Sequence, residues 1–141
     1  MKLVIEGAPR TKKNSLRRLK RGKRIFTVPS AAHEQWEAIA VAQLRRQFTE
    51  WSRGWPGGHG PLSAPINMKA TVYRERAGRA DLLNYLSAVS DALERAGVLE
   101  DDRLVASVDG SRLLLDRGHP RVEIDLTPCE PVRETATPGR T

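Results

Sequence analysis

Apolar residues recur at helical spacing in two segments of the chain. After Pro29, the spacing predicts a helix with one buried stripe, formed by Trp36, Ile39, Ala40, Leu44, Phe48 and Trp51. Ser30 is the expected N-cap of this helix. A second helix is predicted up to Ala96, with a buried side formed by Leu82, Tyr85, Leu86, Val89, Leu93 and Ala96. Asp81 is placed to cap this helix and Gly97 to end it.

Shorter segments have the composition and alternation of strands. They are residues 2–6, 25–28, 66–73, 103–108 and 121–126. The residues of 66–73 that share the expected buried face are Ile66, Met68, Ala70 and Val72. This order of elements predicts an α+β fold, a mixed β-sheet with two main helices packed on it. If the strands that flank the second helix are parallel neighbours, their connection should be right-handed.

The length of 141 residues fits one domain, which we expect to cover residues 1–126. Residues 127–141 include Pro128, Pro131 and Pro138 and are expected to form a disordered tail. No apolar run approaches the roughly 20 residues that cross a bilayer, and the N-terminus does not resemble a signal peptide. We therefore expect a cytoplasmic protein without membrane contact. The single cysteine, Cys129, excludes an intramolecular disulfide and a multi-cysteine zinc site.

The positive charge of the chain is concentrated near its N-terminus. Of 24 Lys and Arg residues, ten lie in residues 2–24, together with one acid, Glu6. The rest of the chain holds 14 basic and 16 acidic residues, so the net charge of +7 comes from this segment. We define residues 8–24 as the basic arm and expect it to be a loop. Such segregation favours a polyanion partner, because each neutralised phosphate releases counterions. A solvated loop that only aids solubility is the alternative.

Acidic residues flank the second predicted helix. Asp81 lies at its start, Asp91 on its polar face, and Asp101 and Asp102 after its end. Clustered carboxylates favour a hard cation such as Mg²⁺, which suits phosphodiester hydrolysis. A helix of about 15 residues is roughly 22 Å long, however, so Asp81 and Asp102 are expected at opposite ends. A shared site needs either a sharp return of the chain after Gly97 or an Asp102 from a second subunit. A helix cap, a solvated face and a polar turn are the ordinary alternatives.

The segment RADLLNYLSAVSDALERAGVLEDDRLV, followed by a strand and PRVEI, resembles the RusA family of Holliday junction resolvases. That family typically has Asp-x-Asp-Asn at the start of a helix and a Lys four residues after the second Asp. Asp-Ala-Leu, Gly and Asp-Asp follow in that order. The segments IEGAPRTKKNS and TVPS look like the branch found in phages and prophages. The similarity spans roughly residues 3–126.

The resemblance implies a Mg²⁺-dependent homodimer, with Mn²⁺ as an alternative cation, that nicks four-way DNA junctions. The matching positions are Asp81, Asn84, Asp91, Asp101 and Asp102. Asp81 and Asp102 would be the metal ligands, with Asp91 and Asp101 as further catalytic candidates. The DNA-contacting candidates are Asn84 and, in the basic arm, Lys12, Lys13, Asn14, Arg17 and Arg18.

Two positions depart from the family pattern. Leu83 replaces the second Asp, and Ser87 replaces the Lys. Losing a carboxylate weakens metal affinity, and losing the Lys removes a charge that could stabilise the scissile phosphate. An alternative function is therefore a protein of the same fold that binds branched DNA with weakened or no catalysis. A basic RNA-binding protein would explain the arm but leave the acidic residues unexplained.

Overall fold

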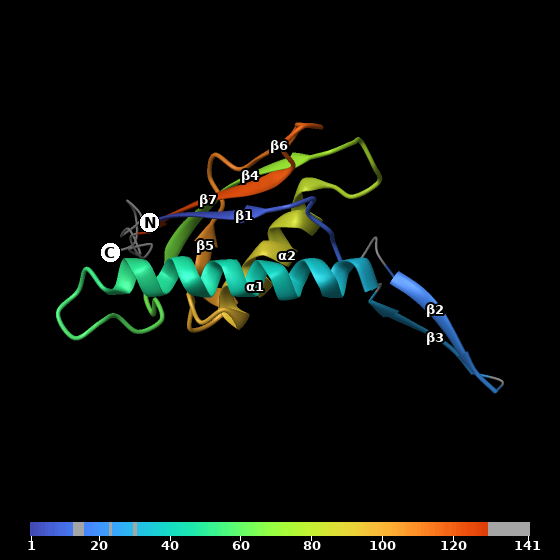
Figure 1. Cartoon of the computed structure of the whole chain (residues 1–141), viewed down its shortest axis with the longest axis horizontal. Helices are drawn as coiled ribbons and strands as arrows, with labels where there is room; N and C mark the ends of the chain where they lie inside the picture. Colours follow the sequence, from blue (N-terminus) through green and yellow to red (C-terminus); the bar gives the residue numbers. More distant parts are fainter. Residues whose placement is uncertain (13–15, 23, 30, 130–141) are drawn as a thin grey trace, which may run out of the picture.

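The computed structural model describes residues 1–12, 16–22, 24–29 and 31–129, and shows a sheet with two helices on one side (Figure 1). The sheet contains β1 (Lys2–Glu6), β4 (Ile66–Arg74), β5 (Val105–Ser107), β6 (Arg112–Leu115) and β7 (Arg121–Pro128). The helices are α1 (Ala31–Ser52) and α2 (Leu82–Arg95), and a short 3₁₀ helix, η1 (Asp102–Leu104), follows α2. The remaining strands, β2 (Leu16–Arg21) and β3 (Arg24–Pro29), form a separate hairpin that projects past the amino end of α1. The predicted α+β class is confirmed.

The sheet is mixed, and its strand order places β7 between β1 and β4. Both β1 and β4 run antiparallel to β7. The other side of β4 is shared by two parallel strands, β5 beside its first residues and β6 beside its last four. In the sequence α2 lies between β4 and β5, and these two strands are parallel neighbours in the sheet. This is the arrangement for which a right-handed connection is expected.

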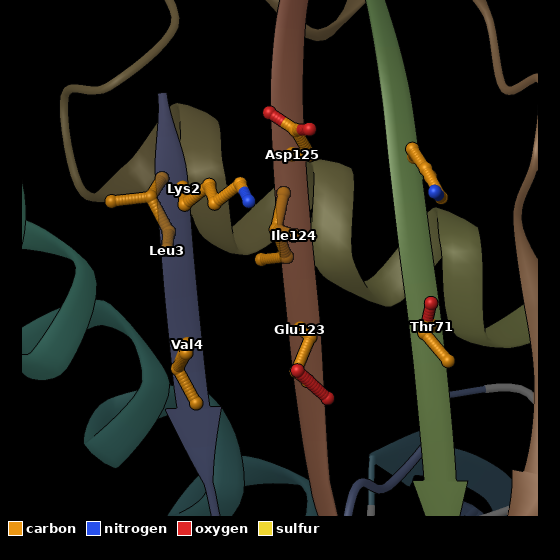
Figure 2. Close-up of a pocket in the computed structure, with 8 residues that line it drawn as sticks. Lys2, Leu3, Val4, Thr71, Glu123, Ile124 and Asp125 are labelled. Atoms are coloured by element: carbon orange, nitrogen blue, oxygen red, sulfur yellow. The ribbon is translucent and has the colours of Figure 1, made fainter.

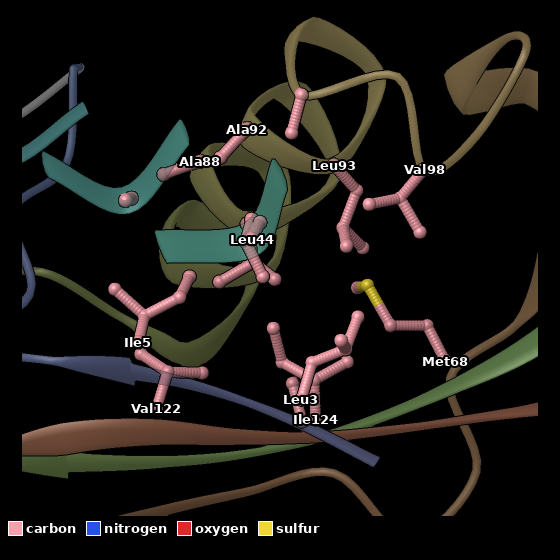
Figure 3. Close-up of a cluster of buried hydrophobic side chains, with 14 of the residues drawn as sticks. Leu3, Ile5, Leu44, Met68, Ala88, Ala92, Leu93, Val98, Val122 and Ile124 are labelled. Carbon is pink, nitrogen blue, oxygen red and sulfur yellow. The ribbon is translucent and has the colours of Figure 1, made fainter. Parts of the chain in front are cut away.

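One face of the sheet forms the core with both helices. Along β4 the burial alternates as predicted, with Ile66, Met68, Ala70 and Val72 buried. The helices cover this face with apolar side chains, among them Leu44 of α1 and Leu93 of α2 (Figure 3). Removing this apolar surface from water is the main stabilising contribution to such a fold.

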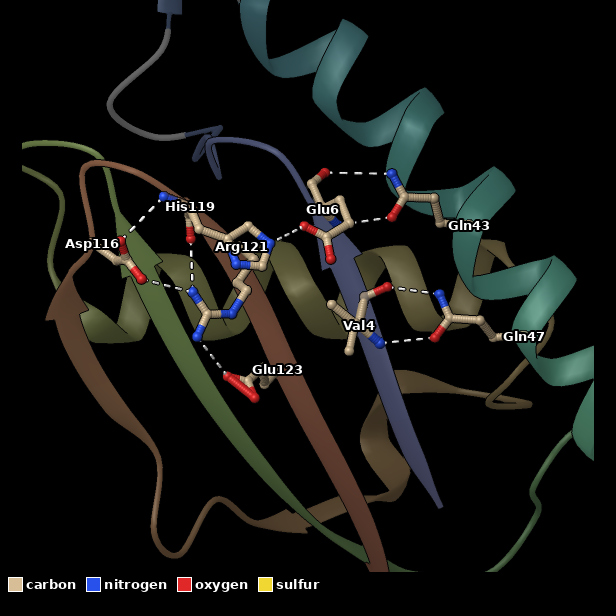
Figure 4. Close-up of polar contacts among 8 residues, drawn as sticks. All are labelled: Val4, Glu6, Gln43, Gln47, Asp116, His119, Arg121 and Glu123. Carbon is tan, nitrogen blue, oxygen red and sulfur yellow. Dashed lines mark hydrogen bonds and ion pairs between the residues drawn. The ribbon is translucent and has the colours of Figure 1, made fainter.

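The edge strand β1 is closed by two glutamine side chains of α1 (Figure 4). Gln47 accepts a hydrogen bond from the backbone N–H of Val4 at 2.8 Å and donates one to its carbonyl oxygen at 2.7 Å. Gln43 makes the same pair of contacts with Glu6, at 2.7 and 3.4 Å. The amides thus take the place of a neighbouring strand. This blocks an edge that could otherwise pair with another chain.

The first helical stripe is confirmed except at one position. Trp36, Ala40, Leu44 and Phe48 are buried, and Trp51 is half-buried, but Ile39 is 54% exposed. Ile39 directly precedes Ala40, which is fully buried. Neighbouring residues on a helix point about 100° apart, so the narrow buried stripe of α1 excludes Ile39.

Other segments differ from the predicted boundaries. The basic arm is not simply a loop, because it contains β2, which pairs with β3, a strand that begins at the last residue of the arm. Gly22, which follows β2, has φ +59°, a conformation that hairpin turns favour and that glycine adopts without strain. The predicted strand 103–108 is split into η1 and a three-residue β5. β6 was missed, since four residues show little alternation.

The end of the fold also differs from the prediction. β7 continues to Pro128, so Thr127 belongs to the sheet, where it pairs with Asn67. The rest of the predicted tail, from residue 130, lies outside the described residues, as does Ser30. Within the described ranges, no helix is long and apolar enough to span a membrane.

Candidate metal centre

The two ends of α2 are defined by local hydrogen bonds. At the amino end, a carboxylate oxygen of Asp81 accepts a hydrogen bond from the backbone N–H of Asn84 at 2.9 Å. At the other end, Gly97 takes φ +77°, and its N–H donates to the carbonyl of Glu94. The N–H of Val98 donates to the carbonyl of Leu93, which completes a Schellman motif. The predicted cap and helix stop are both confirmed.

Beyond Gly97 the chain turns back sharply and is held there. Val98 and Leu99 are fully buried in the core. Leu62 holds this segment through its backbone, donating to the carbonyl of Val98 at 2.8 Å and accepting from the N–H of Glu100 at 2.9 Å. This short parallel bridge directs the following residues, including η1, towards the last turns of α2.

The return of the chain brings three carboxylates together. Oxygen atoms of Asp91, Glu94 and Asp102 all lie within 4.8 Å of one another. We refer to these residues as the acidic cluster. Asp91 and Glu94 are three positions apart on α2 and therefore share a helix face, and Asp102 comes from the first position of η1. Two of the predicted site residues, Asp91 and Asp102, therefore lie next to each other in space.

The chemistry of the acidic cluster fits a hard divalent cation. Its donors are all carboxylate oxygens, and none of the three residues is buried, so water can reach the same position. Mg²⁺ prefers oxygen ligands and keeps several waters. Glu94 was not among the predicted site residues. Its spacing from Asp91 was the available signal, but only the return of η1 gives that pair a third ligand.

Asp101 has a structural role beside the cluster. Its carboxylate caps η1 by accepting from the backbone N–H of Arg103 at 2.8 Å, and it pairs with the Arg103 guanidinium at 3.0 Å. Hydrogen bonds from Arg103 lower the pKa of Asp101 to about 2. The carboxylate is therefore ionised and engaged by an arginine. The geometry favours Asp102 over Asp101 as a ligand.

Asp81 does not join the acidic cluster within one chain. It precedes α2 by one residue, whereas Asp91 lies ten positions further along. At 1.5 Å per residue this places them about 15 Å apart along the helix axis. Asn84 lies in the first turn with Asp81, at the same end. Leu83 is 71% exposed there, so the apolar side chain at this family Asp position is not part of the core.

The predicted DNA-contacting residues of the basic arm are only partly described. Lys12 is exposed, and Lys13 and Asn14 lie outside the described residues. Arg17 and Arg18 belong to β2, where they pair with Val28 and Thr27 of β3. A hairpin thus carries part of the arm's charge on an ordered backbone that projects from the body of the fold (Figure 1).

The uncovered face of the sheet is polar, and its charges are largely balanced. A cavity of about 210 Å³ there is lined by Lys2 and Lys69 as well as Glu123 and Asp125 (Figure 2). Further along, Arg121 lies between Asp116 at 2.9 Å and Glu123 at 3.2 Å (Figure 4). Arg121 lowers the pKa of Asp116 by hydrogen bonding to it. These pairs compensate each other, so this face has no excess charge of the kind that the arm carries.

Comparison with known proteins matches nearly the whole folded chain. Residues 6–127 match the model of the family described as endodeoxyribonuclease RusA. The crossover junction endodeoxyribonuclease RusA of Aquifex aeolicus (strain VF5) is 28% identical over 130 residues, which make up 92% of this chain and 93% of that protein. The matched residues include the basic arm, both helices and the acidic cluster.

Proposed function

Because the chain belongs to the RusA family of endodeoxyribonucleases, we propose that it is a metal-dependent endonuclease that nicks four-way DNA junctions. The single observation that carries the proposal is the acidic cluster, since Asp91, Glu94 and Asp102 converge within 4.8 Å at the end of α2. Carboxylates this close together repel each other, and a bound cation removes this repulsion. Mg²⁺ is the proposed cation, and Mn²⁺ is an acceptable substitute for the same oxygen ligands.

In this proposal, residues of the chain bind the cation and position the DNA for hydrolysis. Asp91, Glu94 and Asp102 would hold the cation from one side and leave the solvent side open. A bound Mg²⁺ lowers the pKa of a water ligand and stabilises negative charge on the phosphate. The basic arm would hold the DNA backbone, which fixes position without reading bases. A junction is recognised largely by its shape, so few base contacts are expected.

A homodimer is proposed to complete the site. Asp81 belongs to the family motif, yet it lies about 15 Å along α2 from Asp91. An antiparallel approach of two α2 helices would place Asp81 of one copy near the acidic cluster of the other. The exposed Leu83 lies on this helix and would gain an apolar contact. A two-fold protein would also match the two-fold symmetry of a four-way junction.

The alternative is a junction-binding protein with weak or no cleavage. It is favoured by Leu83 and Ser87, which replace an Asp and a Lys of the family motif, and both positions are exposed. Glu94 offers a carboxylate that could compensate for the missing Asp in the metal site. The positive charge of the missing Lys has no such replacement within the acidic cluster.

The deciding experiment is a cleavage assay on a synthetic four-way junction with Mg²⁺ or Mn²⁺. Wild type is compared with Asp102→Asn and with a matched control, Glu50→Gln, which removes an exposed carboxylate at the far end of α1. Paired symmetric nicks that persist in Glu50→Gln and disappear in Asp102→Asn support the endonuclease. Tight junction binding without nicks, in both metals, supports the binding protein instead.

A further inference from the structure

Four arginines gather at the amino end of α2, away from the acidic cluster. Arg74 is the last residue of β4, and Arg76 and Arg79 lie in the loop that connects β4 to Asp81. Arg10 approaches the same loop from the root of the basic arm. This group is separate from the arm's hairpin in the sequence and was not among the predicted DNA-contacting residues.

The arginines line two adjoining cavities of about 100 and 270 Å³. The root of the basic arm, residues 8–11, forms one side, and the loop of residues 74–80 forms the other. Tyr85 of α2 lines both cavities. We call this the arginine cleft. Among its lining residues, Glu75 is the only acid.

The arginines divide into those that build the cleft and those that remain available. Arg74 holds the loop in place by donating to the carbonyls of Gly78 at 3.3 Å and Ala80 at 3.1 Å. Its Nε is buried and has no hydrogen-bond acceptor among the described residues. Its guanidinium also lies 5.9 Å from the ring centroid of Tyr85, a distance at which a cation is attracted to an aromatic face.

The other arginines have guanidinium groups that a ligand can engage. Arg76 and Arg79 are exposed, and neither guanidinium has an ion-pair partner within the described part of the chain. Arg10 faces Glu75 at 3.5 Å, but both side chains are 39% exposed. Such solvent-exposed pairs are weak and exchange readily for a stronger partner.

We propose that the arginine cleft binds a phosphate of the DNA backbone. The excess positive charge of the cleft favours an anionic ligand. The planar guanidinium group can donate two parallel hydrogen bonds to two oxygens of one phosphate. A phosphate oxygen in the smaller cavity would also offer an acceptor to Arg74. The cleft adjoins both the basic arm and Asp81, so one DNA strand can run from the arm across the amino end of α2. That the anion is DNA rests on the proposed function.

The balanced cavity on the uncovered sheet face provides the contrast. That cavity has two lysines and two carboxylates, whereas the arginine cleft has four arginines and one carboxylate. Both are open to solvent, so the difference between them lies in the charges of their lining residues. Only the arginine cleft would therefore gain from releasing the counterions of a phosphate.

The test measures binding of a fluorescent four-way junction without divalent metal, at several salt concentrations. The variants are Arg79→Gln and the double variant Arg76→Gln/Arg79→Gln. Arg53→Gln is the matched control, since it removes an exposed arginine at the far end of α1. Because both substituted side chains of the double variant are exposed, its melting temperature should equal that of wild type.

We expect the double variant to bind the junction about tenfold or more weakly, and the slope of log Kobs against log salt to fall by about one, as for the loss of one phosphate contact. Arg79→Gln should give about half of the change in slope, and Arg53→Gln should behave as wild type. Equal affinity and slope in the double variant and the control would overturn the phosphate site. Failure of the proposed function is visible separately, because a wild type that binds DNA without nicking it leaves this comparison intact.

Discussion

The two ends of α2 carry opposite charges and are built in different ways. At the carboxyl end, Asp91, Glu94 and Asp102 converge within 4.8 Å. At the amino end, the arginine cleft surrounds the approach to Asp81. The acidic residues meet because the chain folds back after Gly97, whereas the arginines gather because a loop and the arm root lie side by side. One helix thus separates an acidic end from a basic end.

The separation of the two ends bears on the homodimer that we propose. A hydrolytic site needs the metal ligands and the scissile phosphate at one point. Here the acidic cluster and the arginine cleft lie at opposite ends of a 14-residue helix, which is about 21 Å long. A second copy with its α2 reversed would bring the cleft of one chain to the acidic cluster of the other.

The largest expected effect comes from removing a ligand at the acidic end. Asp91→Asn should lower the cleavage rate about 100-fold or more, because an amide oxygen is a weaker ligand without the negative charge. It should also abolish stabilisation by Mg²⁺, which amounts to about 1.4 kcal/mol when the metal is at ten times its Kd. Cleavage rates and the melting temperature with and without Mg²⁺ measure both. A Mg²⁺ shift that survives in Asp91→Asn would exclude Asp91 as a ligand.

The amino end is tested next by Asp81→Asn and Asp81→Ala. Asparagine caps a helix as well as aspartate, so Asp81→Asn should keep the stability, whereas Asp81→Ala should lose about 1 kcal/mol. If Asp81 completes the metal site of a second copy, both should reduce cleavage by about tenfold or more. Urea unfolding and cleavage assays separate these roles. Full activity in Asp81→Asn would show that Asp81 is only a helix cap.

A smaller effect is expected from the turn that creates the acidic cluster. Gly97→Ala places a side chain at φ +77° with no steric contact, so its cost is backbone strain of about 1–2 kcal/mol. Gly97 precedes the segment that positions Leu99 and η1. Strain at this residue should therefore shift Asp102, and the affinity for Mg²⁺ should weaken as well. Gly78→Ala is the control in the arginine loop, where no positive φ is needed and space is open. Equal stability of both variants would contradict this assignment.

The smallest effect is expected from Asp101. Its pKa of about 2 lies below the ordinary value of 3.8, because Arg103 stabilises the ionised form. Its contribution to stability is thus present above about pH 4 and is lost as the pH falls towards 2. Asp101→Asn should lower the melting temperature slightly at pH 6 and approach wild type near pH 2, since exposed pairs contribute little. A difference that grows on acidification would contradict the role of Arg103.

The fold was predictable wherever a segment is long and has a clear period. The two helices, the caps at Asp81 and Gly97, and the alternation of β4 followed from side-chain spacing alone. The missed elements, β2 and β6, are short and lack that alternation. Their pairing depends on a turn and on the free side of β4, neither of which is visible in the local pattern.

The candidate site was predictable in its chemistry and less so in its membership. Asp91 and Asp102, two of the expected site residues, lie together in the acidic cluster, whereas Asp101 is engaged by Arg103. Asp81, which was expected as a metal ligand with Asp102, lies at the other end of α2. Glu94 was missed because an acid on a helix surface is ordinary until a third carboxylate approaches it. The arginines after β4 lie close together in the sequence, but the sequence could not show that Arg10 lies opposite them.

The sequence by itself determined the α+β class and the separation of the basic arm from the acidic residues around α2, because these depend on residue order and short-range periodicity. Its motifs also carried the resemblance to the family. The tertiary structure alone decided which charged residues become neighbours. Asp102 reaches Glu94 through a sharp turn held by Leu62, and Arg10 reaches the loop of Arg76 across the fold. Such contacts join residues that are distant in the chain, and local spacing carries no information about them.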